Sequence, residues 1–446
     1  MLRYGPGSVR TAAQRSDDIH PEPPVADDPA LLRLQLRVFA LTWLSYASYY
    51  FTRKNLSVVK SRLHETLQIS TTELGSIETL YLASYAIGQF ASGALGDRIG
   101  ARRLLALGMI GSAAATFVFG ASSTVLPFAL AFAVNGFLQS TGWSGNVKAM
   151  QPFFSSQSRG RVMGLWTTNY QAGGLLATAV ATFLLTHVGW RAAFFGPALW
   201  VVAVGLLVAL FLVEKPEDRG LRPVEPEPIA SQKGQPEEAP TLITLLRLPV
   251  LWTLGLAYFG LKLIRYSLLF WLPFYLKQFL HYSEAQAGYL SLPFEIGGIV
   301  GSIVVGWLSD RFFRHSRLKI TVPTMLLLGV SLITYQLVGG AGLWVNAALL
   351  SCVGFLLFGP DSLLSGTMSQ DIGGRAATGR VAGIINGMGS VGAIFSPLIV
   401  AKVSEAYGWS ALFFGFCAVT VMAAALLFVS ARLVERRQKH PVSPSM

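Results

Sequence analysis

Apolar residues occur along the chain in blocks of roughly 20, separated by short basic or Gly- and Pro-rich stretches. A helix that rises about 1.5 Å per residue needs roughly 20 apolar residues to cross a hydrocarbon layer about 30 Å thick. Because the weak ten-residue alternation of a membrane β-barrel is missing, the blocks predict spanning helices. We expect twelve spans, near residues 36–59, 76–96, 104–122, 125–148, 162–187, 192–213, 249–279, 287–308, 320–338, 343–368, 381–403 and 411–433.

A polar segment divides these spans into two sets of six. Residues 214–240 contain six prolines and alternating charges, which suit a linker and not a bilayer. The predicted chain is therefore an all-α polytopic membrane protein. Its parts are a disordered cytoplasmic tail (1–35), a six-helix bundle (36–213), a cytoplasmic linker (214–247), a second six-helix bundle (248–433) and a cytoplasmic tail (434–446).

The two halves also repeat one another. The motif at residues 160–164 recurs at 379–383, and Gly189-Trp190 recurs as Gly408-Trp409, both 219 residues later. A parallel repeat of six spans predicts two similar bundles related by an axis along the membrane normal, with a cavity between them at the midplane. Such an arrangement is typical of transporters that work by alternating access.

Composition agrees with a membrane protein. Hydrophobic residues make up 52% of the 446 residues and charged residues 13%, whereas a soluble domain carries roughly 25% charge. The net charge of +12 does not indicate nucleic-acid binding, because the basic residues concentrate in tails, linker and even-numbered loops. By the positive-inside rule both termini should be cytoplasmic.

Enzyme chemistry is not expected. The sequence has no Ser-His-Asp set, no zinc spacing and no Gly-rich phosphate loop ending in Lys-Ser or Lys-Thr, which excludes an ATP-driven pump. Cys352 and Cys417 lie in apolar segments and carry no metal spacing. No cofactor or metal is therefore predicted, and secondary transport remains.

Charged residues inside spans are the strongest functional signal, because each costs at least a few kcal/mol at a bilayer centre. Arg53 and Arg265 are 212 residues apart, and Asp97 and Asp310 are 213 apart, so the two arginines occupy equivalent places in the two halves. The charges expected within spans are Arg53, Lys54, Lys148, Lys262, Arg265, Glu295 and Asp361.

Two guanidinium groups that face each other across a cavity suit a phosphate, because each can donate bidentate hydrogen bonds to its oxygens. The alternative is that one or both arginines pair with Glu295 or Asp361, or extend to an interface. Lys54 should point to a different helical face from Arg53 and raise the local positive potential. Lys262 lies one turn before Arg265, and Glu295 is the expected counter-ion for either of them. A salt bridge that breaks and re-forms during transport is favoured over direct contact of Lys262 with the cargo, which is the alternative.

The loop after the second span, residues 93–103, resembles the signature loop of the major facilitator superfamily, and residues 306–311 are its degenerate echo. The resemblance implies the fold of six plus six helices. We expect Asp97 to pair with arginines of the neighbouring helix, and the loops with Arg98 and Asp310 to couple conformational states. The alternative is a solvated basic turn.

Further segments resemble the organophosphate:phosphate antiporters within that superfamily, which include glycerol-3-phosphate and hexose-phosphate exchangers. In that family the arginines of spans one and seven hold the phosphate, which the resemblance places on Arg53 and Arg265. Residues 53–63, 85–88, 359–361 and 385–392 look closer to the sugar-phosphate exchangers of solute carrier family 37. The antiporter motifs themselves are residues 49–55, 265–266, 271–277 and Glu295 with 306–310.

Two positions depart from the bacterial glycerol-phosphate carriers. Tyr170 stands where they have a cavity histidine, and Gln89 stands where they have a lysine. Lys148 fits a basic position of the family and could supply the missing charge. Polar or aromatic ligands to a sugar hydroxyl or phosphate oxygen are expected from Asn169, Tyr170, Gln171, Tyr50 and Tyr266.

We therefore predict a transporter that exchanges an organophosphate for inorganic phosphate by alternating access. It should be a monomer in the bacterial inner membrane. One alternative is a membrane sensor of hexose phosphate. Another is a proton-coupled carrier of a different organic anion, with Glu295 or Asp361 as the proton site.

Overall fold

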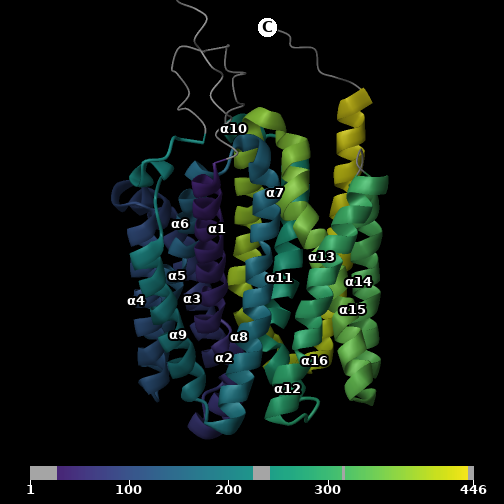
Figure 1. Cartoon of the computed structure of the whole chain (residues 1–446). Coiled ribbons are helices and arrows are strands. Elements are labelled where there is room, and N and C mark those ends of the chain that lie inside the picture. The colour runs from purple at the N-terminus through teal and green to yellow at the C-terminus, as the bar shows by residue number, and fades with distance from the viewer. Residues whose placement is uncertain (1–27, 225–241, 314–316, 440–446) are drawn as a thin grey trace, which may run out of the picture.

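The computed structural model describes residues 28–224, 242–313 and 317–439. Within these ranges every regular element is a helix, which confirms the all-α class (Figure 1). The outer parts of both expected tails, 1–27 and 440–446, and linker residues 225–241 lie outside the described residues.

The first six predicted spans are covered by helices that often break within the membrane. Spans one, four and five each consist of two consecutive helices, whereas spans two, three and six are single helices. The elements are α1 (Pro29–Tyr49), the 3-10 turn η3 (Tyr50–Thr52), α2 (Asn55–Leu67), α3 (Thr71–Ile99), α4 (Ala101–Ala121), α5 (Val125–Gln139), α6 (Thr141–Met150), η4 (Gln151–Phe153), α7 (Ser156–Trp166), α8 (Thr168–His187) and α9 (Ala192–Phe211).

The second half follows the same plan. The described ends of the linker hold two short helices, and α15 continues through a π-helical turn. The elements are η5 (Pro216–Arg219), α10 (Leu242–Leu246), α11 (Pro249–Gln278), α12 (Glu284–Leu290), α13 (Leu292–Phe312), α14 (Leu318–Val338), η6 (Gly339–Ala341), α15 (Leu343–Ser362), η7 (Leu363–Thr367) and α16 (Met368–Lys439).

Some boundaries differ from those expected. The first helix begins at Pro29 and not near residue 36, because the Asp28 side chain caps it by accepting from the Ala30 amide at 2.8 Å. Proline at the first helical position is compatible with a helix start, since its missing N–H would have no intrahelical partner there. The expected tail 1–35 is therefore shorter than predicted.

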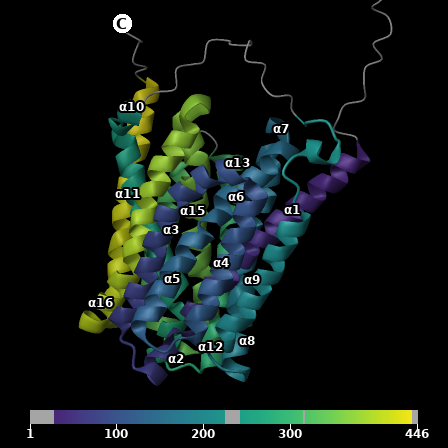
Figure 2. The same cartoon turned by 90° about the vertical axis from the view of Figure 1, so that its left-hand side faces the viewer.

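Helix α16 contains the last two spans, because it turns back at Gly408. This glycine has φ of +80°, and Gly189, its partner in the sequence repeat, has φ of +123°. Near one end of α11, Thr253 lies 2.7 Å from Ser430, while Gly255 packs against Met388. The two arms therefore run side by side in opposite directions, as Figure 2 shows for the yellow end of the chain.

Within the described residues, seven helices are long and apolar enough to cross a membrane, and one of these, 380–434, holds both arms of α16. The other helices that cover predicted spans carry more polar side chains: Arg53 follows α1, and Lys262 and Arg265 lie in α11. Charges within these helices lower their mean hydropathy, although their length and position match the predicted spans.

Glycine permits close helix packing between α13 and α15. A Cβ added at Gly301 would lie 2.6 Å from the Phe355 Cα, and one at Gly297 would lie 2.8 Å from the Ser351 Cα. The two backbones are therefore in direct contact, as small residues allow in membranes.

The halves meet at the end formed by α2 and α12, which we call the closed end (Figure 1). There Gly75 of α3 faces the Pro397 carbonyl of α16, and Glu405 accepts hydrogen bonds from Thr71 and Thr72. Toward the opposite end, where α7 and α10 lie, Cβ atoms at glycines would meet open space. These are Gly93, Gly164, Gly306 and Gly383.

Candidate functional site

Arg53 lies at a break in the first span. After α1 the chain tightens into η3, and α2 begins only at Asn55, whose side chain accepts from the next backbone amide. The freed Thr52 carbonyl accepts from Asn135 of α5 at 2.8 Å. Asn135 therefore stabilises an interrupted backbone at the depth where a transporter with discontinuous helices binds its ligand.

The Arg53 guanidinium is held by neutral groups. Its Nε donates to Gln139 Oε1 at 3.0 Å, and the Tyr81 hydroxyl donates to the same oxygen at 2.8 Å. Its Cζ lies 4.9 Å from the ring centre of Tyr50, 5.9 Å from that of Tyr81 and 5.0 Å from that of Tyr85. No carboxylate pairs with Arg53 in the described chain, so its charge is left for an anion.

Arg265, the second predicted phosphate ligand, has an internal partner. Its Nη1 donates to Asp361 Oδ2 at 2.6 Å, and its Cζ lies 4.4 Å from the Phe358 ring centre. Asp361 follows Pro360, and only Ser362 separates it from the first residue of η7. Of the two alternatives for Arg265, the structure thus shows the pairing with Asp361, at a helix irregularity of a kind common at functional sites.

Tyrosines connect the two arginines. Tyr50 lies close to Arg53, Arg265 and Tyr266. Tyr170 lies close to both Arg265 and Asp361. Arg53, Tyr50, Tyr170, Tyr266 and Arg265 therefore surround one region between the halves, as the repeat predicts for its two arginines.

Two lysines complete the charge of this region. Lys54 Nζ lies 2.9 Å from Glu295 Oε1 of the other half, and both side chains are buried. Lys262 lies 4.9 Å from the Tyr258 ring centre and interacts electrostatically with Asp361. Four cations (Arg53, Lys54, Lys262, Arg265) and two carboxylates (Glu295, Asp361) leave two net positive charges here.

The pairing of Glu295 corrects the sequence analysis, which expected Glu295 to neutralise Lys262 or Arg265. Lys54 instead reaches it because α8 and α13 approach closely at Gly174, where an added Cβ would be 3.9 Å from the Glu295 carboxylate. Lys54 also donates to the Leu269 carbonyl at 3.2 Å, so it bridges the halves.

Lys148 lies apart from the arginines. Its Nζ donates to Asp97 Oδ1 at 2.5 Å and to the Gly96 carbonyl at 2.8 Å, both in the last turn of α3. Asp97 therefore pairs with a lysine of the fourth span, which corrects the expected pairing with arginines. Arg98, beside it, is exposed.

The equivalent loop of the second half does use an arginine. Asp310, at the end of α13, lies 2.6 Å from Arg317 Nη1, which precedes α14. The pairing predicted for the signature loop is thus found in its echo.

Among the three consecutive polar residues of span five, only Tyr170 is directed toward the arginines. Gln171 donates to Ser302 Oγ of the other half at 2.9 Å. Asn169 is fully buried on the face that continues to Gly173, where α8 meets the backbone of Ala47. Asn169 therefore lies toward α1, and within the described chain neither its amide nitrogen nor its amide oxygen has a hydrogen-bond partner, so its role as a ligand stays a prediction.

Sequence reasoning missed the immediate surroundings of Arg53. Tyr81, Tyr85 and Gln139 were not singled out as site residues, although Gln139 and Asn135 are polar residues in an otherwise apolar span. Polar side chains inside a membrane helix face the protein interior, so this signal could have identified them.

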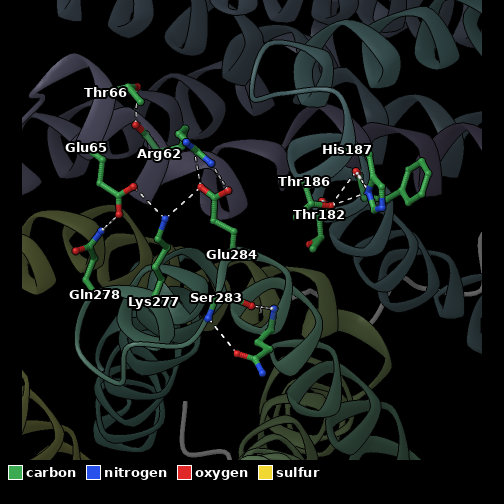
Figure 3. Close-up of polar contacts among 12 residues, drawn as sticks. Arg62, Glu65, Thr66, Thr182, Thr186, His187, Lys277, Gln278, Ser283 and Glu284 are labelled. Atoms are coloured by element: carbon green, nitrogen blue, oxygen red, sulfur yellow. Dashed lines mark hydrogen bonds and ion pairs between the residues drawn. The ribbon is translucent and has the colours of Figure 1, made fainter.

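Charged groups also join the halves at the closed end (Figure 3). Arg62 Nε and Nη2 donate to the Glu284 carboxylate at 2.8 and 2.5 Å. Lys277 lies 3.0 Å from Glu65 and 3.2 Å from Glu284, while Gln278 donates to Glu65 at 2.9 Å. We call these five residues the closed-end network.

A buried pair lies beneath this network. Lys60 and Glu78, both fully buried in the first half, are 2.7 Å apart. The Lys60 Nζ also lies 3.5 Å from the Trp271 ring centre and donates to the Phe270 carbonyl at 3.1 Å. The cation therefore holds the second half by its backbone and by an aromatic face.

Weakening the closed-end network should open that end. In the double variant Arg62→Ala with Lys277→Ala, we expect the closed end to lose about 1–2 kcal/mol of stabilising free energy, since partly exposed pairs contribute up to about 1 kcal/mol each. The population ratio of molecules open at this end to molecules closed there should therefore rise roughly 5- to 30-fold. Electron-resonance distances between spin labels at Thr66 and His281, exposed on opposite halves, should gain a longer component. Lys402→Ala, another exposed cation, is the control; an unchanged distribution in the double variant would contradict the assignment.

Residues 42–397 match the Major Facilitator Superfamily. Human sugar phosphate exchanger 3 is 31% identical over 474 residues, covering 90% of this chain and 95% of that protein. Mouse glucose-6-phosphate exchanger SLC37A2 is 30% identical over 457 residues, covering 87% and 90%.

More distant relatives agree. The probable hexose phosphate transport protein of Chlamydia pneumoniae is 28% identical over 423 residues, covering 91% of this chain and 93% of that protein. Among solved structures, a bacterial homologue of the human lysosomal transporter Spinster, inward-facing and unoccupied, superposes with a TM-score of 0.77 at 16% identity, covering 94% and 100%. That likeness concerns the fold.

Proposed function

The chain belongs to the major facilitator superfamily of membrane transporters, and from that premise we propose that it exchanges an organophosphate for inorganic phosphate. The organophosphate is a sugar phosphate or glycerol 3-phosphate. The observation that carries the proposal is Arg53, a buried guanidinium with no carboxylate partner in the described chain, in a region with two net positive charges.

A phosphate group matches this region in charge and in geometry. Two net positive charges attract an anionic phosphate group and can offset the dianion of inorganic phosphate, and a guanidinium fork donates two parallel hydrogen bonds to phosphate oxygens. The sugar or glycerol part would lie against Tyr50, Tyr266 and Tyr170, whose rings and hydroxyl groups can contact carbon atoms and donate to hydroxyl oxygens. A neutral sugar would leave the cations uncompensated.

Alternating access follows from where the charges lie. Arg53 and Lys54 belong to the first bundle (36–213), whereas Lys262, Arg265, Glu295 and Asp361 belong to the second (248–433). An anion that binds both arginines pulls the bundles together on the side of α7, and an empty site resists closure because like charges repel. Movement between states is thereby coupled to occupancy, which produces exchange and not leak.

Glu295 and Asp361 have a coupling role in this scheme. In the empty site Glu295 neutralises Lys54 and Asp361 neutralises Arg265. When phosphate binds, each ion pair must break, or its cation must interact with the carboxylate and the phosphate together. Asp97 with Arg98, and Asp310, would couple conformational states on the linker side from within each bundle, since Asp97 pairs with Lys148 of the first bundle and Asp310 with Arg317 of the second. The distribution of basic residues supports this side as the cytoplasmic one. We place the protein, as a monomer, in a bacterial inner membrane.

The test is exchange of radiolabelled phosphate by purified protein in proteoliposomes preloaded with phosphate. Glucose 6-phosphate and glycerol 3-phosphate serve as competitors from outside. Saturable uptake that depends on internal phosphate and is inhibited by one organophosphate is expected. Uptake that needs a proton gradient but no internal phosphate would refute exchange and favour proton-coupled transport.

A further inference from the structure

The ion pair between Arg265 and Asp361 uses only part of the hydrogen-bonding capacity of the two side chains. One hydrogen bond, from Nη1 to Oδ2, joins them at 2.6 Å. Within the described chain, Arg265 Nε and Asp361 Oδ1 are both buried and have no hydrogen-bond partner. Buried donors and acceptors without partners cost free energy, so such a pair in a native site calls for a ligand.

A donor next to an acceptor selects its ligand by protonation. The Nε–H group can donate to an anionic oxygen, while Oδ1 can only accept, since an ionised carboxylate has no proton to give. A phosphate group that carries one P–O⁻ and one P–OH satisfies both. Sulfate, a carboxylate and a fully ionised phosphate ester offer no O–H and would face Oδ1 with a lone pair.

We propose that the Arg265–Asp361 pair binds the protonated form of the phosphate group, with Arg265 Nε donating to P–O⁻ and Asp361 Oδ1 accepting from P–OH. The proposal rests on the proposed function and adds to it which ionic form of the cargo is taken. Asp361 is then a specificity-determining residue as well as a counter-ion.

The surroundings leave the acceptor role to Asp361. The titratable groups that face the pair are Tyr258, Lys262 and Tyr266 from α11, Tyr170 from α8 and Tyr50 from η3, while Phe358 of α15 covers the guanidinium. All five of these polar groups can donate hydrogen bonds. The other carboxylate of the region, Glu295, is occupied by Lys54 at 2.9 Å.

The two cargoes should therefore respond differently to pH. A phosphate ester loses its P–OH as pH rises through about 6, its second pKa. Inorganic phosphate has two P–OH groups as the monoanion and still one as the dianion. The apparent affinity for the ester should fall with rising pH while that for inorganic phosphate stays nearly level, whereas a preference for low charge alone would weaken both.

The experiment measures half-inhibition of phosphate exchange by unlabelled phosphate and by glucose 6-phosphate between pH 5.5 and 8, with the same pH on both sides. For the wild-type protein, the half-inhibition concentration of the ester divided by that of phosphate should rise about tenfold or more as the pH is raised across this range. A ratio that stays level overturns the inference without any variant. Absence of phosphate exchange at every pH would instead refute the proposed function.

Variants separate Asp361 from other sources of pH dependence. In Asp361→Asn, whose amide can donate to an ionised ester, the ratio of ester to phosphate half-inhibition concentrations should not change with pH, and sulfate should become a competitor. In Asp361→Glu, the ratio should still rise with pH as in the wild-type protein. Asp218→Asn, the matched change at an exposed residue of the linker, should also keep the pH dependence of the wild-type protein. If Asp361→Asn does not transport, the apparent affinities for ester and phosphate can be measured by ligand-induced thermal stabilisation. A ratio that changes with pH in this variant as it does in the wild-type protein would overturn the assignment of Asp361 as the acceptor from P–OH.

Discussion

Replacing Arg53 by lysine is expected to reduce phosphate exchange about a hundredfold or more, although the charge is retained. A lysine is a point charge and cannot reproduce the planar fork. The loss of two charge-assisted hydrogen bonds, at about 1.5 kcal/mol each, corresponds to about 3 kcal/mol and therefore to about a hundredfold. The initial rate of exchange in proteoliposomes measures it.

The matched control is Arg37→Lys. Arg37 stacks over Phe211, 5.3 Å from Cζ to the ring centre, in α1 far along the chain from the break. It should lower the rate little, because no ligand contact is proposed there. If Arg53→Lys retained a third of the wild-type rate, bidentate binding by Arg53 would be wrong even if phosphate were the cargo.

Replacing Gly301 by valine is expected to abolish most of the folded protein. The added Cβ would overlap the backbone of Phe355, which cannot move aside as a side chain can. Overpacking generally costs about 1–3 kcal/mol and sometimes more, and a β-branched residue adds further bulk. The yield of monodisperse protein in detergent and its melting temperature measure the effect.

Gly306→Val is the control within the same helix. A Cβ at Gly306 has no heavy atom within 4 Å, so valine should fit there. Equal melting temperatures for the two variants would show that α13 and α15 do not pack backbone to backbone.

The sequence predicted the class of fold well because lipid imposes a length on every span. The repeat of Gly189 and Gly408 was also informative, since both glycines have positive φ at equivalent turns. The prediction that Arg53 and Arg265 are both in one region rested on the same offset. Span length, turn glycines and repeat offsets are local or periodic features of the sequence. They can therefore be recognised without knowing how each helix is oriented about its own axis.

Pairing of charges could not be predicted in the same way. Lys148 and Asp97, or Lys54 and Glu295, meet because of the rotation and height of their helices, which hydropathy does not encode. The interruption at Arg53 was also missed, since it depends on Asn135 of another helix satisfying the Thr52 carbonyl. Polar residues in a span identify a site but not its contacts.

The closed-end network has one consequence for the environment in which the protein works. Its side chains are partly exposed, up to 40% for Arg62, whereas Lys54 and Glu295 are buried. Mobile ions screen exposed charges over a Debye length of about 8 Å at physiological ionic strength but affect buried pairs much less. A higher ionic strength on that side of the membrane would therefore shorten the time for which the empty transporter remains closed at this end, without changing how the cargo is bound.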